Sequence, residues 1–360
     1  MLKARHELLD REIPADTKTA LEVFSVRHLV RRIILVSLAL VAVAFISWML
    51  GRYTALPSQI YQAVVEYFTV PESEYADLAL HRALFNIRLP RIIVVILVGM
   101  ALSVAGAAYQ GMFKNPLVSP DLLGASAGAA LGACLALLWN LSNIYIQAFA
   151  FIGGILAVSL VLLINRVVKA DAILGLILGG ILVGSLFQSG TSIIKLVADA
   201  DGKLPSITFW LMGSFASISL KDLLMILPVM LVGYAVLLTQ SWNLNVLSFG
   251  EDEAKSLGIN TGRTRLIVIA AATLLTSCSV AVSGMIGWIG LVVPHLTRAI
   301  VGPNYRVLLP TTMLVGGLFL LIVDNFARLL FEIEIPIGLL TSILGVPFFI
   351  FIYRKNMKGW

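Results

Sequence analysis

Long apolar runs, separated by short polar segments, recur along the chain after a polar N-terminal stretch. A helix needs about 20 apolar residues to cross the roughly 30 Å hydrocarbon core of a bilayer. Ten runs of about this length can be read from the sequence, at 33–50, 90–112, 122–139, 147–165, 172–196, 223–239, 264–283, 285–300, 307–327 and 336–353. The pattern predicts an all-α, polytopic membrane protein with about ten transmembrane helices.

The N-terminal stretch carries charges of both signs. It lacks the short apolar core and small-residue cleavage site of a signal peptide. We therefore predict a cytoplasmic tail over residues 1–32, followed by one transmembrane domain over residues 33–355.

Composition agrees with this pattern. Hydrophobic residues make up 59% of the chain and charged residues 13%, against about 25% charged residues in an ordinary soluble domain. A chain this apolar could not cover a water-exposed surface, whereas a chain in lipid needs none. Composition therefore excludes an ordinary soluble domain, a disordered chain, a collagen-like fibre and a basic nucleic-acid binder, and we expect no nucleic-acid partner.

Basic residues divide unequally between the two faces that the ten spans define. If both termini lie on one side, 18 of the 26 lysines and arginines fall on that side. Cytoplasmic segments carry an excess of Lys and Arg, so we predict a multi-pass protein of the cytoplasmic (inner) membrane with both termini in the cytoplasm. Residues 51–89 and 195–222 are then outer segments, and residues 240–263 form an inner loop.

The sequence contains no recognisable nucleotide site. A P-loop needs Gly-Lys-Ser/Thr after a glycine-rich turn, and the nearest match, residues 250–256, has Ala254 before Lys255 and acidic neighbours that would repel phosphate. We therefore expect no catalytic residues and no enzymatic activity, with ATP hydrolysed by a separate partner.

Metal and cofactor sites are not predicted either. The four histidines are scattered without the spacing of metal ligands, and Cys134 and Cys278 lie inside apolar runs. Carboxylates are nearly absent from the spans, whereas proton- or sodium-driven transporters place them near the midplane. The energy source is therefore expected outside the chain.

Three stretches stand out from generic membrane sequence. They cover residues 88–128, 284–310 and 324–347, and they contain Arg-Leu-Pro-Arg with Asn-Pro-Leu-Val-Ser-Pro, then Gly-Trp-Ile-Gly-Leu-Val-Val-Pro-His-Leu-Thr-Arg, and then Asp-Asn-Phe-Ala-Arg with Ile-Pro-Ile-Gly. In addition, Arg91-Ile-Ile-Val-Val and Arg265-Leu-Ile-Val-Ile open two spans of opposite direction. This echo fits an inverted-topology repeat.

In this order, the three stretches resemble the FecCD family of ATP-binding-cassette (ABC) transporter permeases, over about residues 33–355. The resemblance implies the type II ABC importer permease fold in membrane lipid. It also implies a homodimer or a pair with a related permease, two cytoplasmic ABC ATPase subunits and an extracytoplasmic substrate-binding protein. Pro303-Asn304-Tyr305 departs from an Asp-His pair common in the family, and Trp288 replaces a usual Phe.

The inner loop contains a predicted short helix over residues 248–258. Ser248 and the acidic residues lie at its N-terminal end, and Gly258 ends it. A solvated surface helix is one interpretation. The resemblance instead implies a coupling helix that docks on the ATPase, with the site residues Ser248, Gly250, Glu251, Asp252, Glu253, Ala254, Leu257 and Gly258.

Arg88 and Arg328 fall at the outer membrane surface in this topology. Each could be satisfied locally, for instance by Asp324 or Glu332. The resemblance implies that both arginines receive carboxylates of the binding protein, for which the planar fork of guanidinium donors is suited.

The resemblance also places a translocation path near Gln110, Asn115 and Pro116, the fifth span, and the outer stretch with Phe209 and Trp210. The two aromatic residues could equally be interfacial anchors. From the resemblance, iron–siderophore import is the predicted function. Haem, cobalamin and molybdate remain alternative cargoes, and a proton-coupled secondary transporter or channel and a membrane scaffold are alternatives of other classes.

Overall fold

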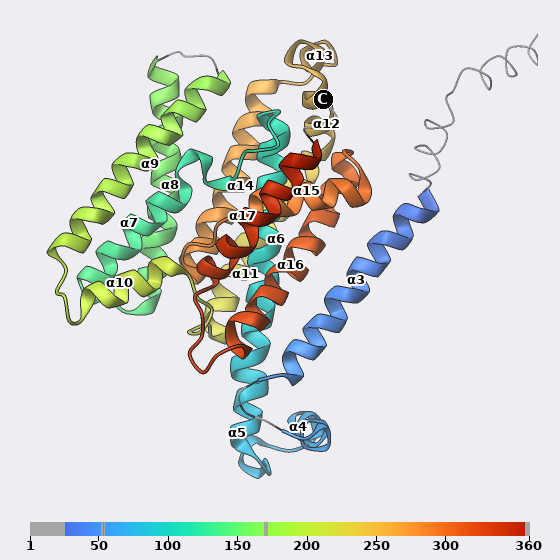
Figure 1. The fold of residues 1–360 in the computed structure, drawn as a ribbon, viewed down its shortest axis with the longest axis vertical. Helices are drawn as coiled ribbons and strands as arrows, with labels where there is room; N and C mark the ends of the chain where they lie inside the picture. The colour runs from blue at the N-terminus through green and yellow to red at the C-terminus, as the bar shows by residue number, and fades with distance from the viewer. Residues whose placement is uncertain (1–25, 52, 54, 169–171, 357–360) are drawn as a thin grey trace, which may run out of the picture.

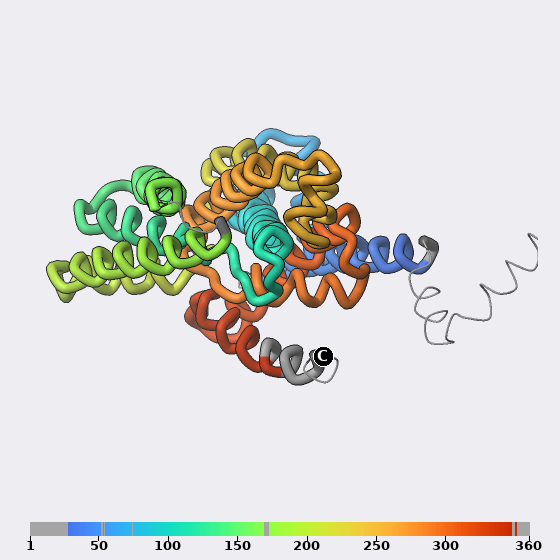
Figure 2. The backbone as a smooth tube through the Cα atoms, turned by 90° about the horizontal axis from the view of Figure 1, so that it is seen from above, coloured from blue at the N-terminus to red at the C-terminus, as the bar shows by residue number. Residues whose placement is uncertain are grey.

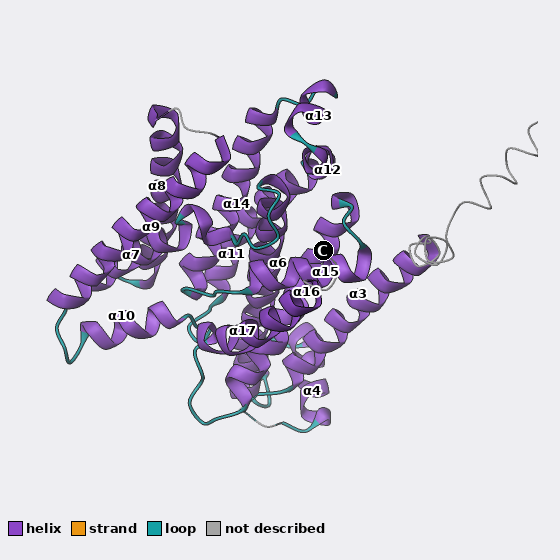
Figure 3. Ribbon diagram, turned by 45° about the horizontal axis from the view of Figure 1, so that its top comes forward, coloured by secondary structure: helices purple, strands orange, loops and turns teal. Residues whose placement is uncertain are grey.

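A computed structural model describes residues 26–51, 53, 55–168 and 172–356, which form helices and no strand (Figure 3). Among these residues, seven helices are long and apolar enough to span a membrane, and three shorter apolar helices occur at 125–138, 289–301 and 337–347. The main helices are α3 (Val26–Met49), α6 (Leu89–Met112), α7 (Ala125–Leu138), α8 (Asn143–Val168), α9 (Ala172–Val197), α11 (Leu220–Thr239), α14 (Thr261–Ser283), α15 (Ile289–Val301), α16 (Tyr305–Leu329) and α17 (Ile337–Asn356).

These helices coincide with the ten predicted spans and confirm the all-α polytopic fold. The predicted tail differs in part, because residues 26–32 are already helical and continue into the first span. The rest of that tail lies outside the described residues. Charged residues such as Arg31 and Arg32 interrupt the apolar pattern over residues 26–32, so the pattern placed the start of the helix too late. Helical geometry does not require apolar side chains.

The long helix α6 forms the centre of one group of spans, with α11, α14, α15 and α16 around it (Figures 1 and 2). Most of its side chains are buried. Where α15 begins, a Cβ on Gly106 would overlap the backbone of Gly290. Small residues let membrane helices approach closely, so this glycine pair explains why α15 packs directly on α6.

A second group consists of α7, α8 and α9, with the short helix α10 (Lys203–Met212) across one end (Figure 1). Gly128 of α7 and Gly153 of α8 face each other, and a Cβ on either would overlap the other's carbonyl. Through these contacts, α7 and α8 form a tight antiparallel pair that also packs on α14.

The two ends of the bundle differ. At one end lie α12 (Ser241–Phe249), α13 (Glu251–Ser256) and the turn after α6 (Figure 1). At the other end lie α4 (Pro57–Thr69), α5 (Leu78–His81) and the segment that precedes α17. We call these the α13 end and the α4 end.

A π-helical turn, Arg82–Arg88, connects α5 to α6 at the α4 end. The N–H of Leu89 donates to the carbonyl of Leu84, five residues back, and Pro90 follows with no N–H to donate. The helix α4 contacts α5 through Glu66, whose Oε2 lies 3.0 Å from Nε2 of the buried His81. The α4 end is therefore folded back against the base of α6.

Candidate functional site

The acidic segment forms two helices rather than one. Gly250 separates α12 from α13, which corrects the predicted single helix over 248–258. Ser248 belongs to α12, where its hydroxyl donates to the carbonyl of Asn245 at 2.6 Å, and it does not cap α13. Serine is a common N-cap, but here the backbone turns two residues later. The acidic residues do occupy the first turn of α13, as predicted.

The end of α13 is a Schellman motif. The N–H of Gly258 donates to the carbonyl of Lys255, and that of Ile259 donates to the carbonyl of Ala254, both at 2.9 Å. Gly258 has a φ of +80°, a left-handed conformation that favours glycine. The buried Ala254 packs with Ile259. Gly258 therefore terminates the helix as the sequence predicted.

One ion pair ties α13 to a membrane span. Oε2 of Glu251 lies 2.6 Å from Nη2 of Arg265 in α14, and Oε1 accepts from the hydroxyl of Thr261 at 3.2 Å. The hydrogen bond from Arg265 is the main reason that the pKa of Glu251 lies below its usual value. We call residues 249–258, which include α13, the tip. The ion pair connects this tip to the beginning of α14, a largely buried helix.

The solvent-exposed surface of the tip combines apolar and acidic side chains. Phe249 is 78% exposed and Leu257 67% exposed, and the side chain of Asp252 is almost fully exposed. Val246, Leu247 and Ala254 are buried beneath them. Large apolar groups held in water by a rigid tip favour contact with another protein.

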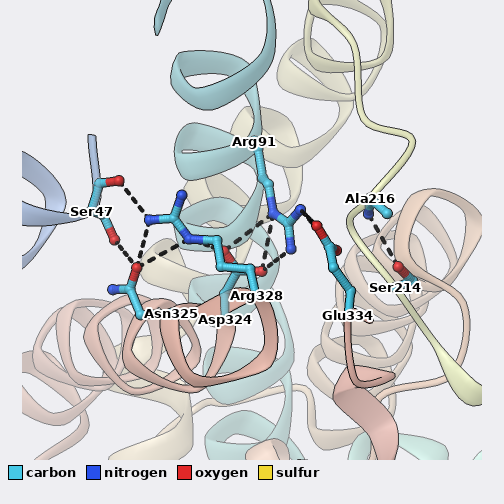
Figure 4. A network of polar contacts seen from close by, with 8 residues as sticks. All are labelled: Ser47, Arg91, Ser214, Ala216, Asp324, Asn325, Arg328 and Glu334. Carbon is cyan, nitrogen blue, oxygen red and sulfur yellow. Dashed lines mark hydrogen bonds and ion pairs between the residues drawn. The ribbon is translucent and has the colours of Figure 1, made fainter. Parts of the chain in front are cut away.

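An ionic network links three segments at the α4 end (Figure 4). Arg91 of α6 donates from Nη2 to Asp324 at 2.8 Å and from Nη1 to Glu334 at 3.0 Å. Asp324 is fully buried in α16, and Arg91 is nearly so. Arg91 and Asp324 both lie in the motifs that stand out in the sequence, but the sequence alone did not pair them. An aspartate inside an apolar span was the available signal.

Arg88 and Arg328 border this network and are 5% and 6% exposed. Arg88 donates to the carbonyls of Trp48, Met49 and Tyr53. Arg328 donates to the carbonyl of Ser47 and to Asn325, with Asp324 at 3.8 Å (Figure 4).

Both arginines therefore have local partners. Asp324, which the sequence suggested, lies near Arg328. Glu332, the other suggested partner, is not among the partners of either arginine. A cavity of about 200 Å3 opens beside Arg88, Arg91, Arg328 and Glu334. Within the described residues, Nη1 of Arg328 has no hydrogen-bond partner.

The residues predicted along the path do not lie together. Gln110, Asn115 and Pro116 are at the α13 end, where Gln110 is buried and the other two are exposed. Phe209 and Trp210 belong to α10 at the opposite end and line a cavity of about 440 Å3. Phe209 is about half-exposed, and Trp210 packs on a small cluster formed by α7, α8 and α14.

In the described part of the chain, no group of three or more His, Cys, Asp or Glu side chains is placed to hold a metal ion. Cys134 and Cys278 are buried as free thiols. The main ion pairs instead form within each end, between Glu251 and Arg265 at the α13 end and between Arg91 and Asp324 at the α4 end.

Comparison with known proteins identifies a family. The profile of the FecCD transport family matches residues 39–355. The molybdate import system permease protein MolB of Haemophilus influenzae is 40% identical over 324 residues, which cover 90% of this chain and 95% of that protein. An iron chelatin transport system permease protein of Helicobacter pylori is 38% identical over 273 residues, covering 76% of this chain and 82% of that protein.

A solved structure has the same fold. An ABC transporter of the metal-chelate type, in an inward-facing conformation, superposes with a TM-score of 0.80 at 39% identity and covers 89% of this chain and 98% of that chain. The chain belongs to the FecCD transport family. It is a multi-pass membrane protein and the permease subunit of an ABC importer.

Proposed function

We propose that two copies of this permease, or one copy and a close relative, form the pathway of an ATP-driven importer of an anionic metal complex. ATPase subunits dock on α12 and α13 from the cytoplasm, and an extracytoplasmic binding protein delivers the cargo at the α4 end. The observation that carries the proposal is the exposed tip of Phe249, Asp252 and Leu257, held on α14 by the Glu251–Arg265 ion pair. A short, anchored helix can transmit the movement of a partner to a span, whereas a loose loop would absorb it.

The coupling test uses two substitutions in this tip. A proline at Gly250 is incompatible with its φ of 161°, and Glu251→Arg places a cation beside Arg265. Both Gly250→Pro and Glu251→Arg should abolish transport and cargo-stimulated ATP hydrolysis, while membrane insertion persists. Arg263→Gln, at an exposed position of the same end, is the matched control. Normal stimulated hydrolysis in both variants contradicts the coupling assignment.

Docking of the binding protein is proposed at Arg88 and Arg328. The cavity beside them gives a carboxylate access to these guanidinium groups, and charge-assisted bonds to arginine are strong when desolvated. Arg88→Glu or Arg328→Glu should weaken association with the binding protein by about tenfold or more and make it more sensitive to salt. Basal ATP hydrolysis should survive. Equal affinities of wild type and both variants at low salt would exclude this role.

The cargo proposed first is an iron–siderophore complex, and the second candidate is molybdate. A cavity of about 500 Å3 between α7, α9 and α10 is lined by Gln188, Ser192, Lys195 and apolar residues, with no carboxylate among its lining residues. Such a wall suits an anion, which is a chemistry that molybdate and anionic ferric chelates share. Molybdate is considered because the MolB similarity extends over 95% of that relative.

Reconstituted vesicles with the ATPase and binding protein decide between the cargoes. Uptake of radiolabelled ferric siderophore and of molybdate is measured side by side, with ATP inside and with a protonophore added. ATP-dependent, protonophore-insensitive uptake of one cargo identifies it, and uptake that follows a proton gradient without ATP contradicts the proposal. Lys195→Gln should lower uptake of the anionic cargo, and Lys203→Gln, at the partly exposed first residue of α10, serves as the control.

A further inference from the structure

A continuous series of polar contacts leads from α12 to the turn that follows α6. It begins at Asn245 of α12, whose Nδ2 donates to Oδ1 of Asn304 at 2.9 Å. The backbone N–H of Tyr305 donates back to Oδ1 of Asn245 at 2.8 Å. Asn304 is also the N-cap of α16. The amide of Asn245 therefore fixes α12 to the first turn of α16.

Arg298 of α15 connects Tyr305 of α16 to Gln110 of α6. Its Nη2 donates to the hydroxyl of Tyr305 at 3.3 Å, and its Nη1 donates to Oε1 of Gln110 at 2.6 Å. The ring of Tyr305 lies against Gly111, where a Cβ would overlap it. One guanidinium thus holds α15, α16 and α6 together near the α13 end.

Gln110 connects Arg298 to the turn that follows α6. Its Nε2 donates to the carbonyls of Val118 and Leu291, each at 3.3 Å. Arginine can only donate hydrogen bonds, so the amide oxygen must face Arg298 and the amide nitrogen must face the two carbonyls. Gln110 is 3% exposed, and its orientation depends on Arg298.

The turn itself, residues 113–119, is shaped by local bonds. Lys114 has a φ of +49°, and Oδ1 of Asn115 accepts from the N–H of Leu117 at 2.9 Å. Asn115 and Pro116 are exposed, whereas Val118 is buried. The turn joins α6 to the short helix before α7, so its position sets how the two groups of spans meet at the α13 end.

We propose that Arg298 is a positioning residue that transmits displacement of α12 to the turn at 113–119 and thereby couples the cytoplasmic tip to the inner mouth of the pathway. The inference rests on the proposed docking of ATPase subunits at α12 and α13. Each contact in the series is a hydrogen bond, and the side chains of Gln110 and Tyr305 are buried. The Asn245–Asn304 bond is exposed, whereas the bonds from Tyr305 onward are at least partly buried. Movement of α12 must therefore carry the turn along or break partly buried hydrogen bonds, which costs free energy.

The experiment compares Arg298→Gln with Arg263→Gln in the complete transporter with its ATPase and binding protein. Substitutions within such networks change coupling by about 2- to 30-fold. For Arg298→Gln we expect normal assembly and basal ATP hydrolysis, with transport reduced about tenfold and the ATP hydrolysed per cargo raised by the same factor. Arg298→Lys should restore part of the coupling, because an ammonium can still donate to Gln110. Arg263→Gln should behave as wild type.

Two further variants separate transmission from simple stability. Tyr305→Phe removes only the acceptor hydroxyl and should uncouple by about two- to threefold without loss of thermal stability. Asn245→Ala combined with Arg298→Gln should be no worse than the stronger single variant, because both interrupt one route. Multiplying effects in the double variant contradict a shared route.

Other outcomes overturn the proposal directly. If Arg298→Gln transports with the wild-type ratio of ATP to cargo, Arg298 transmits nothing. If transport, basal hydrolysis and melting temperature fall together in Arg298→Gln and Tyr305→Phe alike, the residue only stabilises the fold. Uncoupling by Gly250→Pro without uncoupling by Arg298→Gln rejects this route alone, whereas normal coupling in Gly250→Pro rejects the docking site.

Discussion

Arg91 and Arg265 open the two most deeply buried of the long spans, at opposite ends of the bundle. Each forms an ion pair with a carboxylate from another part of the chain: Arg91 with Asp324 and Glu334, and Arg265 with Glu251. The two arginines begin similar short sequences, yet their carboxylates differ in burial. Asp324 is fully buried within the bundle, whereas the side chain of Glu251 is 38% exposed on a six-residue helix.

Because of this difference in burial, the two arginine–carboxylate pairs have different structural roles. At the α4 end, Arg91 connects α6, α16 and the segment before α17, so the network holds spans together. At the α13 end, Arg265 holds only a small tip. A buried ion pair is costly to break because one charge is left uncompensated, while an exposed pair contributes little to stability.

The largest expected effect is at the buried pair. Arg91→Ala leaves Asp324 buried without its main counterion, so the free energy of unfolding should fall by about 3–5 kcal/mol. Denaturant titration of the purified permease in detergent micelles measures this change. Arg82→Ala, at an exposed position on the π-helical turn that precedes α6, should change stability by less than about 0.5 kcal/mol. A loss below about 1 kcal/mol for Arg91→Ala would show that the network does not hold the spans together.

A smaller effect is expected at the end of α13. Gly258→Ala forces a Cβ into the left-handed region, which costs about 1–2 kcal/mol. Hydrogen exchange of the Leu257, Gly258 and Ile259 amides, which form the terminating bonds, should accelerate by about tenfold. Gly262→Ala is the matched control, because Gly262 lies in helical backbone and a Cβ there would meet only Oδ1 of Asn260, at an ordinary contact distance of 3.7 Å. Unchanged exchange in Gly258→Ala would contradict the Schellman assignment.

A smaller effect still is expected for Glu251→Gln. Glu251 is 38% exposed although Arg265 is buried, so solvent screens this ion pair and it should contribute about 0–1 kcal/mol. Exchange at α13 should therefore rise only slightly, and global stability should not change. A double-mutant cycle with Arg265→Gln measures the interaction energy between the two side chains. An interaction energy as large as that of Arg91 with Asp324 would remove the distinction between the two ends.

The smallest expected effect is that of pH on hydrogen exchange at α13. Arg265 holds the folded-state pKa of Glu251 below its unfolded value, so the stabilisation is present above the unfolded pKa and is lost as pH falls through the folded pKa. Exchange at α13, corrected for intrinsic rates, should therefore rise between about pH 5 and about pH 3. Glu251→Gln should remove that dependence. A rise of the same size in the glutamine variant would assign it to another group.

Much of the fold was accessible from the sequence because each span is a local pattern. An apolar run of sufficient length is helical in lipid whatever its neighbours do, and all ten predicted segments are helices. The end of α13 at Gly258 was also predictable, because only the local backbone decides where glycine is required. The break at Gly250 was not, because Ser248 has the chemistry of a helix cap and nothing local shows that its hydroxyl bonds Asn245 within α12.

The sequence by itself thus determined the membrane class of this protein, its helical segments and the acidic composition of the tip, since each depends on residues that are neighbours along the chain. Only the tertiary structure decided which charges meet. Arg91 and Asp324 are 233 positions apart, and Arg298 and Gln110 are 188 apart, so no periodicity links them. Their pairing follows from helix packing around α6, where glycines bring backbones close enough for a buried charge to find its partner.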